Sequence, residues 1–231
     1  MIRVLPSEEA AVPSWFPSDS RVAECLARHQ VIYRFRAPKY QIRLLKDLAA
    51  LLPAGKARVL DIGTGSGLIS EAISEFLPGK SVVGVDVAPR VLPRMRLSFV
   101  AYDGVNLPFI DGSFDCSLLC NVLHHVDPEK RTRLMQEALR VTGGGPVIIK
   151  DHVARSGWDR LRLGALDAAG NLPFSGMVRA EYLSDGDWET LLVQLGCTGA
   201  MLPVSTYRSG LSALCFPNRL EICFSVRAVS K

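Results

Sequence analysis

The sequence lacks the patterns that define several classes of protein. No apolar run reaches the roughly 18 residues that a membrane-spanning helix needs. Lysine and arginine exceed aspartate and glutamate only by 27 to 23, and they form no block of the kind that binds nucleic acid or an anionic membrane surface. Internal repeats and low-complexity segments do not occur either. We therefore expect neither a membrane span nor a nucleic-acid partner.

The six cysteines form no Cys-x-x-Cys pair. Cys116 and Cys120 lie within an apolar, strand-like run, which is typical of buried free thiols in a reducing compartment. The segment from Met1 to Glu9 meets acidic residues before any apolar core, so we expect no secretory signal. These features together favour a cytoplasmic enzyme.

What remains is an ordinary globular composition. The chain has 231 residues, of which 48% are hydrophobic and 22% charged, so it is long enough for one α/β domain and short for two. Three prolines interrupt the first 18 residues, and helical spacing of apolar residues then predicts helices over 19–35 and 39–52. We expect residues 1–52 to form an N-terminal arm with cap helices, and residues 53–231 to form a single domain.

From residue 53 onward, the pattern alternates between strands and helices. The predicted strands are 58–62, 81–86, 97–101, 114–120 and 146–150, and the predicted helices are 66–77, one near Arg90, and 127–141. Such alternation implies a parallel sheet with right-handed crossovers. The fold class is therefore α/β.

The alternation stops after the fifth strand. Residues 152–183 are expected to form a lid-like insertion that closes the substrate pocket, with a helix over 158–168 and a turn-rich stretch over 170–176. A capping box at Ser184 begins another helix. Residues 220–226 alternate between apolar and polar side chains, which predicts an antiparallel strand near the edge of the sheet.

The strongest motif is a glycine loop after the first strand of this alternation. The run Asp61-Ile62-Gly63-Thr64-Gly65-Ser66-Gly67 places three glycines at alternate positions directly before a helix. Glycine lets the backbone pass close under a ligand, and the helix N-terminus supplies unpaired N–H groups there. The spacing differs from the Gly-x-Gly-x-x-Gly of dinucleotide enzymes. It suits an adenosine with an amino-acid tail, because no pyrophosphate has to be seated.

Two further aspartates follow the next two strands. Asp86 ends the second strand about 20 residues beyond the loop, where a carboxylate accepts ribose hydroxyls. Asp103 follows the third strand and is placed to receive an adenine amino group. Because the carboxyl ends of parallel strands meet at one edge of a sheet, both should lie beside the glycine loop.

This combination resembles the class I S-adenosylmethionine-dependent methyltransferases, in the small-molecule (type 11) branch that includes quinone-biosynthesis C-methyltransferases. The likeness is specific over residues 57–152, where a Val-Thr pair stands in place of the Lys-Pro that the family usually has before its late glycines. The resemblance implies a Rossmann-like, doubly wound, seven-stranded and mostly parallel sheet with an antiparallel strand near the C-terminus. Its motifs are Leu107-Pro108-Phe109 with Asp111, Ser113-Phe114-Asp115, Val122 to Val126, and Gly143-Gly144-Gly145.

The resemblance also implies a site for S-adenosylmethionine. Its methionine part would lie along the glycine loop, its ribose at Asp86 and its adenine at Asp103 and Gly104. Backbone carbonyls near Asn121 would hold the amino group, and the helix with Tyr40 would cap the cofactor. The implied cofactor residues are Asp61, Gly63, Thr64, Gly65, Gly67, Asp86, Val87, Asp103, Gly104, Asn121 and Tyr40.

The candidate catalytic residues follow the fourth and fifth strands. Methyl transfer requires alignment, exclusion of water and, for some acceptors, removal of a proton. A neutral imidazole can take that proton. We expect His124 or His125 to act on the substrate, with His152 and Asp151 as further candidates. The alternative is that one of the adjacent histidines only supports the loop. We expect no metal, because neighbouring histidines seldom point to one ion from a strand end.

Apolar residues and arginines in the insertion favour a small, hydrophobic or aromatic acceptor. Two alternatives remain: a non-catalytic subunit that binds S-adenosylmethionine, and a nucleic-acid methyltransferase, although no Asp/Asn-Pro-Pro-aromatic motif follows the fourth strand. A short-chain dehydrogenase is disfavoured because no tyrosine is followed by lysine four residues later. The sequence leaves open the acceptor, the atom that is methylated, and whether the chain forms a homodimer.

Overall fold

A single mixed sheet forms the centre of the molecule. The computed structural model describes residues 2–6, 8–76, 79–88, 90–92, 95–171 and 179–229. Within them the strands are β1 (Ile2–Val4), β2 (Ala57–Ile62), β3 (Lys80–Asp86), β4 (Ser98–Ala101), β5 (Cys116–Cys120), β6 (Val147–His152), β7 (Cys197–Met201) and β8 (Glu221–Ala228). Their order in the sheet is β1-β7-β8-β6-β5-β2-β3-β4. Only β8 runs antiparallel to its neighbours among these strands. The predicted α/β class, mostly parallel with an antiparallel strand near the C-terminus, is confirmed.

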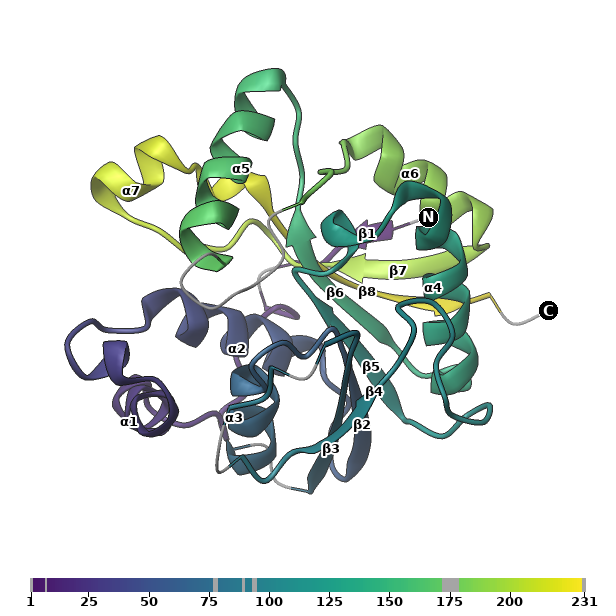
Figure 1. Ribbon diagram of the computed structural model, residues 1–231, viewed down its shortest axis with the longest axis horizontal. Helices are drawn as coiled ribbons and strands as arrows, with labels where there is room; N and C mark the ends of the chain where they lie inside the picture. The colour runs from purple at the N-terminus through teal and green to yellow at the C-terminus, as the bar shows by residue number, and fades with distance from the viewer. Residues whose placement is uncertain are drawn as a thin grey trace.

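Helices cover both faces of this sheet (Figure 1). They are α1 (Asp19–His29), α2 (Lys39–Leu51), α3 (Leu68–Phe76), α4 (Pro128–Thr142), α5 (Gly157–Asn171), α6 (Asp185–Gln194) and α7 (Gly210–Cys215), with short 3-10 turns η1 (Val31–Arg34), η2 (Leu123–His125) and η4 (Asn218–Leu220). In Figure 1, α1, α2 and α3 lie on one side of the sheet, and α4 and α6 on the other. None of the helices in the described part of the chain combines the length and the apolar character that crossing a membrane requires.

Alternate side chains of the central strands enter two separate buried clusters. Val59 and Leu118 pack with the helices α1, α2 and α3, whereas Leu60 and Leu119 pack with α4 and α6. This alternation follows from the period of two in a strand. Because both faces are buried, the central strands read as continuous apolar runs in the sequence.

The sheet has one strand more than the seven that the sequence predicts. Residues 2–4, expected to be part of an irregular arm, form the edge strand β1, and Ile2 pairs with Gly199 in parallel β7. Three residues ahead of a proline are too few to show a strand pattern. Their conformation comes from pairing with a segment that is distant in the sequence.

The position predicted for the last strand is wrong. β8 lies between β6 and β7 in the interior of the sheet, not near its edge. The polar residues in its alternating pattern favour an exposed edge, but Glu221 is buried and forms an ion pair with the equally buried Lys150. Charge compensation, and not solvent, accommodates this residue.

Two helix predictions also change. The helix expected over 19–35 ends at His29, because Gln30 adopts an extended conformation and the run from Val31 to Tyr33 has low helix propensity. Residues 87–88, 90–92 and 95–97, the described part of the segment between β3 and β4, contain no helix, consistent with the two prolines there. Most of the turn-rich stretch predicted over 170–176 lies outside the described residues. The division of the chain at residue 52 stays a prediction.

Candidate active site

The glycine loop joins β2 to α3 and is half-buried. Gly63, Gly65 and Gly67 have φ angles of 74°, 56° and 78°, in the left-handed region that glycine adopts without strain. The amides of Gly63 and Thr64 donate to the Val85 carbonyl at 2.8 and 3.0 Å, which fixes the loop on β3. A Cβ added to Gly65 would meet no atom within 4 Å. At Gly65 the loop therefore faces free space, in which a ligand can lie against the backbone.

Thr64 fits against β3 because residue 84 is glycine. A Cβ at Gly84 would lie 2.8 to 2.9 Å from three side-chain atoms of Thr64. The Thr64 hydroxyl lies 3.1 Å from that of Ser70, and the Ser70 hydroxyl donates to Asp61. The packing of β3 thus positions the side chains under the loop. Gly84 was not among the residues that the sequence predicted for the site.

Asp61 carries a buried carboxylate oxygen without a hydrogen-bond partner in the described part of the chain. Its Oδ2 accepts from Ser70, whereas its Oδ1 has no hydrogen-bond partner among the described residues. Burial raises the pKa of Asp61 to about 6, against hydrogen bonds from Ser70 and Thr64 that lower it. A buried acceptor without a partner is costly, so a donor supplied by a ligand would be stabilising. The amino group of S-adenosylmethionine fits this requirement.

This pKa leads to a prediction about cofactor affinity. Asp61 is protonated below about pH 6 and ionised above it, because its pKa is raised from the usual value. The affinity for S-adenosylmethionine should therefore increase as the pH rises from 5 to 7, as the carboxylate becomes available to the cationic amine. Isothermal titration calorimetry across this range tests the expectation. In Asp61→Asn the increase should be absent, and an unchanged profile in that variant would exclude Asp61 as its source.

The other predicted cofactor residues lie at the ends of β3 and β4. Asp86 is buried and accepts from the amide of Gly65 at 2.7 Å, so it directly adjoins the loop. Asp103 is exposed and accepts from the Asn106 backbone at 2.6 Å and from its side chain at 2.7 Å, within its own turn. Gly104 lies close to Val87, because an added Cβ would come within 3.0 Å of the Val87 side chain.

Asn121 and Tyr40 meet at a buried lysine that the sequence did not single out. Asn121 has a φ of 57°, the only positive value outside glycine among the described residues. Its side chain accepts from Lys150 Nζ at 2.9 Å, and the Tyr40 hydroxyl accepts from the same nitrogen at 2.5 Å. Lys150 also donates to Glu221, which Arg208 contacts at 2.6 Å. This network holds α2, the end of β5 and β8 together.

The charges in this network stabilise one another. Burial opposes the charge of Lys150, but the Glu221 carboxylate outweighs it and raises the pKa of Lys150 above its usual range. Correspondingly, Lys150 and His152 hold the pKa of Glu221 well below its usual value despite burial. Burial and the Glu221 carboxylate raise the pKa of Tyr40 to about 12, so its hydroxyl stays neutral. These partners explain how a lysine can be fully buried in the sheet.

The turn η2 places the two adjacent histidines next to the glycine loop. Val122 contacts Gly63 so closely that a Cβ there would lie 2.6 Å from a Val122 methyl group. The amide of Leu123 donates to Asp151 at 2.9 Å, which joins the turn to the end of β6. The rings of His124 and His125 follow directly, with their centroids 4.1 Å apart.

Three of the four predicted catalytic residues form one buried cluster, with His125 at its margin. His124 Nδ1 donates to the Asp151 carboxylate, and the ring of His152 lies 5.2 Å from that of His124. His125 Nδ1 donates to the Arg179 carbonyl at 2.8 Å. The histidine that is most accessible here is His125, whose side chain is 14% exposed, compared with 0% for His124 and 5% for His152. The structure therefore brings these residues together, while their roles stay predictions.

The imidazoles of the cluster differ in charge. Burial opposes protonation of His124, but the Asp151 carboxylate outweighs it and raises the pKa of His124 to about 9. Burial lowers the pKa of His125, and the charge on His124 lowers it further. Burial and Lys150 likewise lower the pKa of His152. Near neutral pH, His124 is therefore a cation held by Asp151, whereas the other two rings are neutral.

Two residues that the sequence did not predict complete the cluster. Asp167 of α5 places Oδ2 3.5 Å from His124 Nε2 and 3.4 Å from His125 Nε2. Tyr182 stacks on the ring of His124 at 5.2 Å. Only one local signal could have identified Asp167: it is the single charged residue in the apolar segment 163–169.

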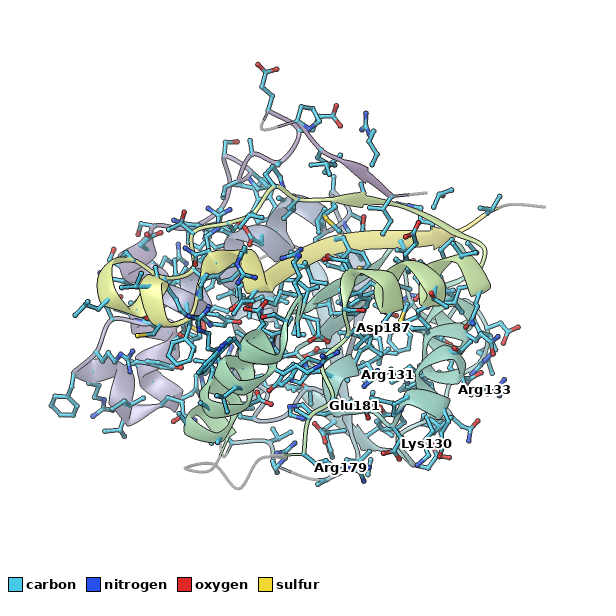
Figure 2. All side chains as sticks on the ribbon, turned by 90° about the horizontal axis from the view of Figure 1, so that it is seen from above. Lys130, Arg131, Arg133, Arg179, Glu181 and Asp187 are labelled. Atoms are coloured by element: carbon cyan, nitrogen blue, oxygen red, sulfur yellow. The ribbon has the colours of Figure 1, made fainter. Side chains whose placement is uncertain are left out.

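Arg131 of α4 joins the turn η2 to the segment that contains Glu181 and Tyr182 through hydrogen bonds. Its guanidinium donates to the carbonyls of Leu123 at 3.0 Å and Glu181 at 2.6 Å. Figure 2 shows Arg131 beside Glu181 and Asp187. The neighbouring basic side chains on this surface have acidic partners; the pairs are Lys130–Asp127 at 2.8 Å, Arg133–Glu137 at 3.5 Å and Arg179–Asp127 at 3.8 Å. The charges gathered here are therefore largely compensated.

Comparison with known proteins agrees with this geometry. Residues 60–149 match the family model described as "Methyltransferase domain". A demethylmenaquinone methyltransferase from Renibacterium salmoninarum is 31% identical over 135 residues, covering 50% of this chain and 54% of the relative. A ubiquinone biosynthesis O-methyltransferase from Cereibacter sphaeroides is 38% identical over 108 residues, covering 42% and 43%. The chain thus spans about half the length of the curated relatives it matches.

Solved structures share the fold over most of the chain. A chain from the complex of the Haloferax volcanii Trm112 methyltransferase activator with a methyltransferase has a TM-score of 0.61 at 16% identity, covering 92% of this chain and 95% of that one. A SAM-dependent methyltransferase from Thermotoga maritima has a TM-score of 0.58 at 17% identity, covering 89% and 99%. At these identities the likeness concerns the fold alone.

The matched segment identifies residues 60–149 as a methyltransferase domain, and the fold is the one that solved S-adenosylmethionine-dependent methyltransferases have. Within that class, residues 60–149 belong to the type 11 branch, to which the curated quinone-biosynthesis relatives are similar. The membership predicted from the glycine loop and its acidic partners is confirmed. The likeness to these methyltransferases implies use of S-adenosylmethionine.

Proposed function

We propose that this protein transfers a methyl group from S-adenosylmethionine to a small, hydrophobic or aromatic acceptor. The observation that carries the proposal is the buried Asp61 oxygen without a partner, beside a glycine loop that faces open space at Gly65. An adenosine with a cationic amino-acid tail has the donors and the shape for this place. When bound, S-adenosylmethionine supplies an electrophilic methyl group on a sulfonium.

The chain's own residues would hold the cofactor as the family resemblance implies, except that the buried Asp61 oxygen without a partner would join the carbonyls near Asn121 in holding the amine. Asp61 would accept from the amine, and Asp86 would exchange its contact with the Gly65 amide for the ribose hydroxyls. Val87 is 49% exposed beside Gly104, which supports a role as an apolar surface under the adenine. Asp103 would reach the adenine amino group after releasing part of its turn.

The cluster of His124, His125, Asp151 and His152 would meet the acceptor. It begins two residues beyond Val122, which contacts the glycine loop, so the chain passes directly from one place to the other. A neutral imidazole in this cluster would remove a proton from a phenol, enol or acidic carbon. The Asp151–His124 pair would fix the turn, and α5 would exclude water from the acceptor side.

Asp86→Ala should weaken binding of S-adenosylmethionine by about 1–3 kcal/mol, because it removes a buried acceptor for the ribose. Calorimetric titration measures this loss. Asp111→Ala is a suitable control, since that carboxylate is 80% exposed on another loop and should leave the affinity as it is. Equal affinities in the Asp86 variant and the unaltered protein would refute the ribose assignment.

The competing function is a subunit that binds S-adenosylmethionine without turning it over. Formation of S-adenosylhomocysteine with a panel of phenols and enolisable carbonyl compounds separates the two. We expect turnover with at least one member. If the protein binds the cofactor tightly but turns over neither the panel compounds nor nucleic acid, the non-catalytic subunit is favoured. If it turns over nucleic acid but none of the panel compounds, the proposal of a small acceptor is contradicted.

A further inference from the structure

In both histidines of η2, Nδ1 forms a hydrogen bond, and Nε2 points toward Asp167 of α5. His124 Nδ1 donates to Asp151, and His125 Nδ1 donates to the Arg179 carbonyl. A ring that donates through Nδ1 presents a lone pair at Nε2 once Nε2 has lost its proton, and a metal ion that binds there displaces that proton. This is the arrangement found in metal-binding histidines, whose second nitrogen is usually held by a carboxylate or a backbone carbonyl.

The atoms that face one another across this space lack hydrogen-bond partners. His124 is completely buried, and its Nε2 has no partner within the described residues. Asp167 Oδ2 also lacks one there, as does the Tyr182 hydroxyl. Leaving several buried polar atoms unsatisfied in one place is unfavourable. A group that binds two imidazoles and a carboxylate would satisfy the first two of these atoms together.

The spacing of these atoms fits a single metal ion. Asp167 Oδ2 lies 3.5 Å from His124 Nε2 and 3.4 Å from His125 Nε2, and the ligand atoms of the three residues all lie within 4.8 Å of one another. In a tetrahedral site with bonds of about 2.0–2.2 Å, neighbouring ligand atoms are about 3.3–3.6 Å apart. The two measured distances therefore match two edges of such a tetrahedron.

We propose that His124 Nε2, His125 Nε2 and Asp167 Oδ2 bind one divalent transition-metal ion of the zinc type. Two imidazoles and one carboxylate suit zinc and its neighbours better than magnesium or calcium, which prefer oxygen ligands. Three protein ligands leave the fourth position open, as in catalytic zinc sites. The sequence argument against a metal does not hold for this geometry, because the 3-10 turn directs both neighbouring rings toward Asp167.

A second arrangement competes for the same histidine. His124, Asp151 and His152 also bring one ligand atom each within 4.8 Å of the others. In that set, however, Asp151 already accepts from His124 Nδ1, so an ion would have to break a formed hydrogen bond. The Asp167 set keeps this bond as a support for the ligand. It also leaves the contact between His152 and Glu221, at 3.3 Å, in place.

The open position gives the ion a role in the reaction, and this part rests on the proposed function. An oxygen atom of the acceptor would bind there, which selects a phenol or enol over an amine or a hydrocarbon. The ion would favour loss of the hydroxyl proton to solvent or to the nearby His152 ring. The oxygen, or the carbon conjugated with it, would then be the nucleophile.

Metal binding should be measured without cofactor or acceptor. Protein freed of metal with a chelator would be titrated with Zn²⁺ by calorimetry, and with Co²⁺ by its visible absorption, which reports tetrahedral coordination. We expect one ion per chain. Asp167→Asn and His125→Gln should each weaken binding by at least about 100-fold, since loss of a ligand exceeds the 10–100-fold typical of its supporting partners. His29→Gln, on α1, is the matched control and should bind as the unaltered protein does.

Several results would overturn the site. These are no saturable binding, equal affinity in Asp167→Asn and the unaltered chain, or binding that is lost in His152→Gln but kept in Asp167→Asn. Thermal unfolding with and without Zn²⁺ provides a second readout. The ion should raise the Tm of the unaltered protein and of His29→Gln, but not that of Asp167→Asn or His125→Gln. If Asp167→Asn does not fold, the loss of metal binding is measured in His125→Gln, because the His125 side chain is partly exposed and its replacement disturbs the fold less. Affinity for S-adenosylmethionine, measured on the same samples, separates the two proposals: intact cofactor binding without metal binding overturns only this inference.

Discussion

Replacing His125 by alanine is expected to lower the rate of methyl transfer by about 10²–10⁴-fold, the range for loss of a group that handles the acceptor's proton. The affinity for S-adenosylmethionine should stay as it is, because the cofactor contacts are assigned to other residues. His125 is the most accessible ring of the cluster and faces Asp167. The loss is expected whether the imidazole takes the proton itself or holds an ion that favours its release. Single-turnover formation of S-adenosylhomocysteine measures the rate.

His29→Ala serves as the control for this variant and should keep the full rate. A joint loss of thermal stability and cofactor affinity in the His125 variant would instead mean that the ring only supports the turn. Near-normal turnover would mean that alignment suffices for the reaction. In that case Asp151 and His152 become the candidates for orienting the acceptor.

Glu221→Gln is expected to lower the free energy of unfolding by about 3–5 kcal/mol. The substitution preserves the shape of the side chain but leaves the Lys150 ammonium buried without a carboxylate. Arg208, which contacts the same carboxylate at 2.6 Å, loses its partner as well. Unfolding in urea, followed by circular dichroism, gives the difference between the variant and the unaltered protein.

Glu9→Gln provides the exposed counterpart of this experiment. Glu9 pairs with Arg3 at 2.6 Å, but the two side chains are 50% and 67% exposed. Its loss should therefore cost about 0–1 kcal/mol. A change of the same small size in Glu221→Gln would show that water reaches Lys150 and that the network contributes little.

The cofactor half of the site could be predicted because its signals are local. Gly63, Gly65 and Gly67 need left-handed backbone, and Asp61 and Asp86 stand at the carboxyl ends of apolar strands. A strand, a turn and a helix start lie within one short stretch of sequence. The parallel arrangement of the strands then brings the distant aspartate to the same edge of the sheet.

The acceptor half could be predicted only in part. The histidines follow strand ends, but Asp167 and Tyr182 reach them from α5 and the segment after it, whose positions depend on tertiary packing. The burial of Lys150 was equally inaccessible, because it depends on Glu221 in a strand that enters the sheet between β6 and β7. Polar alternation in β8 indicated an exposed edge, since sequence alone does not reveal which charges are paired.

The contact between Thr64 and Gly84 has a consequence for the evolution of this domain. With threonine at position 64, any side chain at position 84 collides with it, because even a Cβ would approach three of its atoms to 2.8–2.9 Å. A smaller residue at position 64 removes this collision and releases position 84 from the requirement for glycine. The two positions should therefore change together among related sequences, with an alanine or larger residue on β3 accompanied by a reduced side chain in the loop.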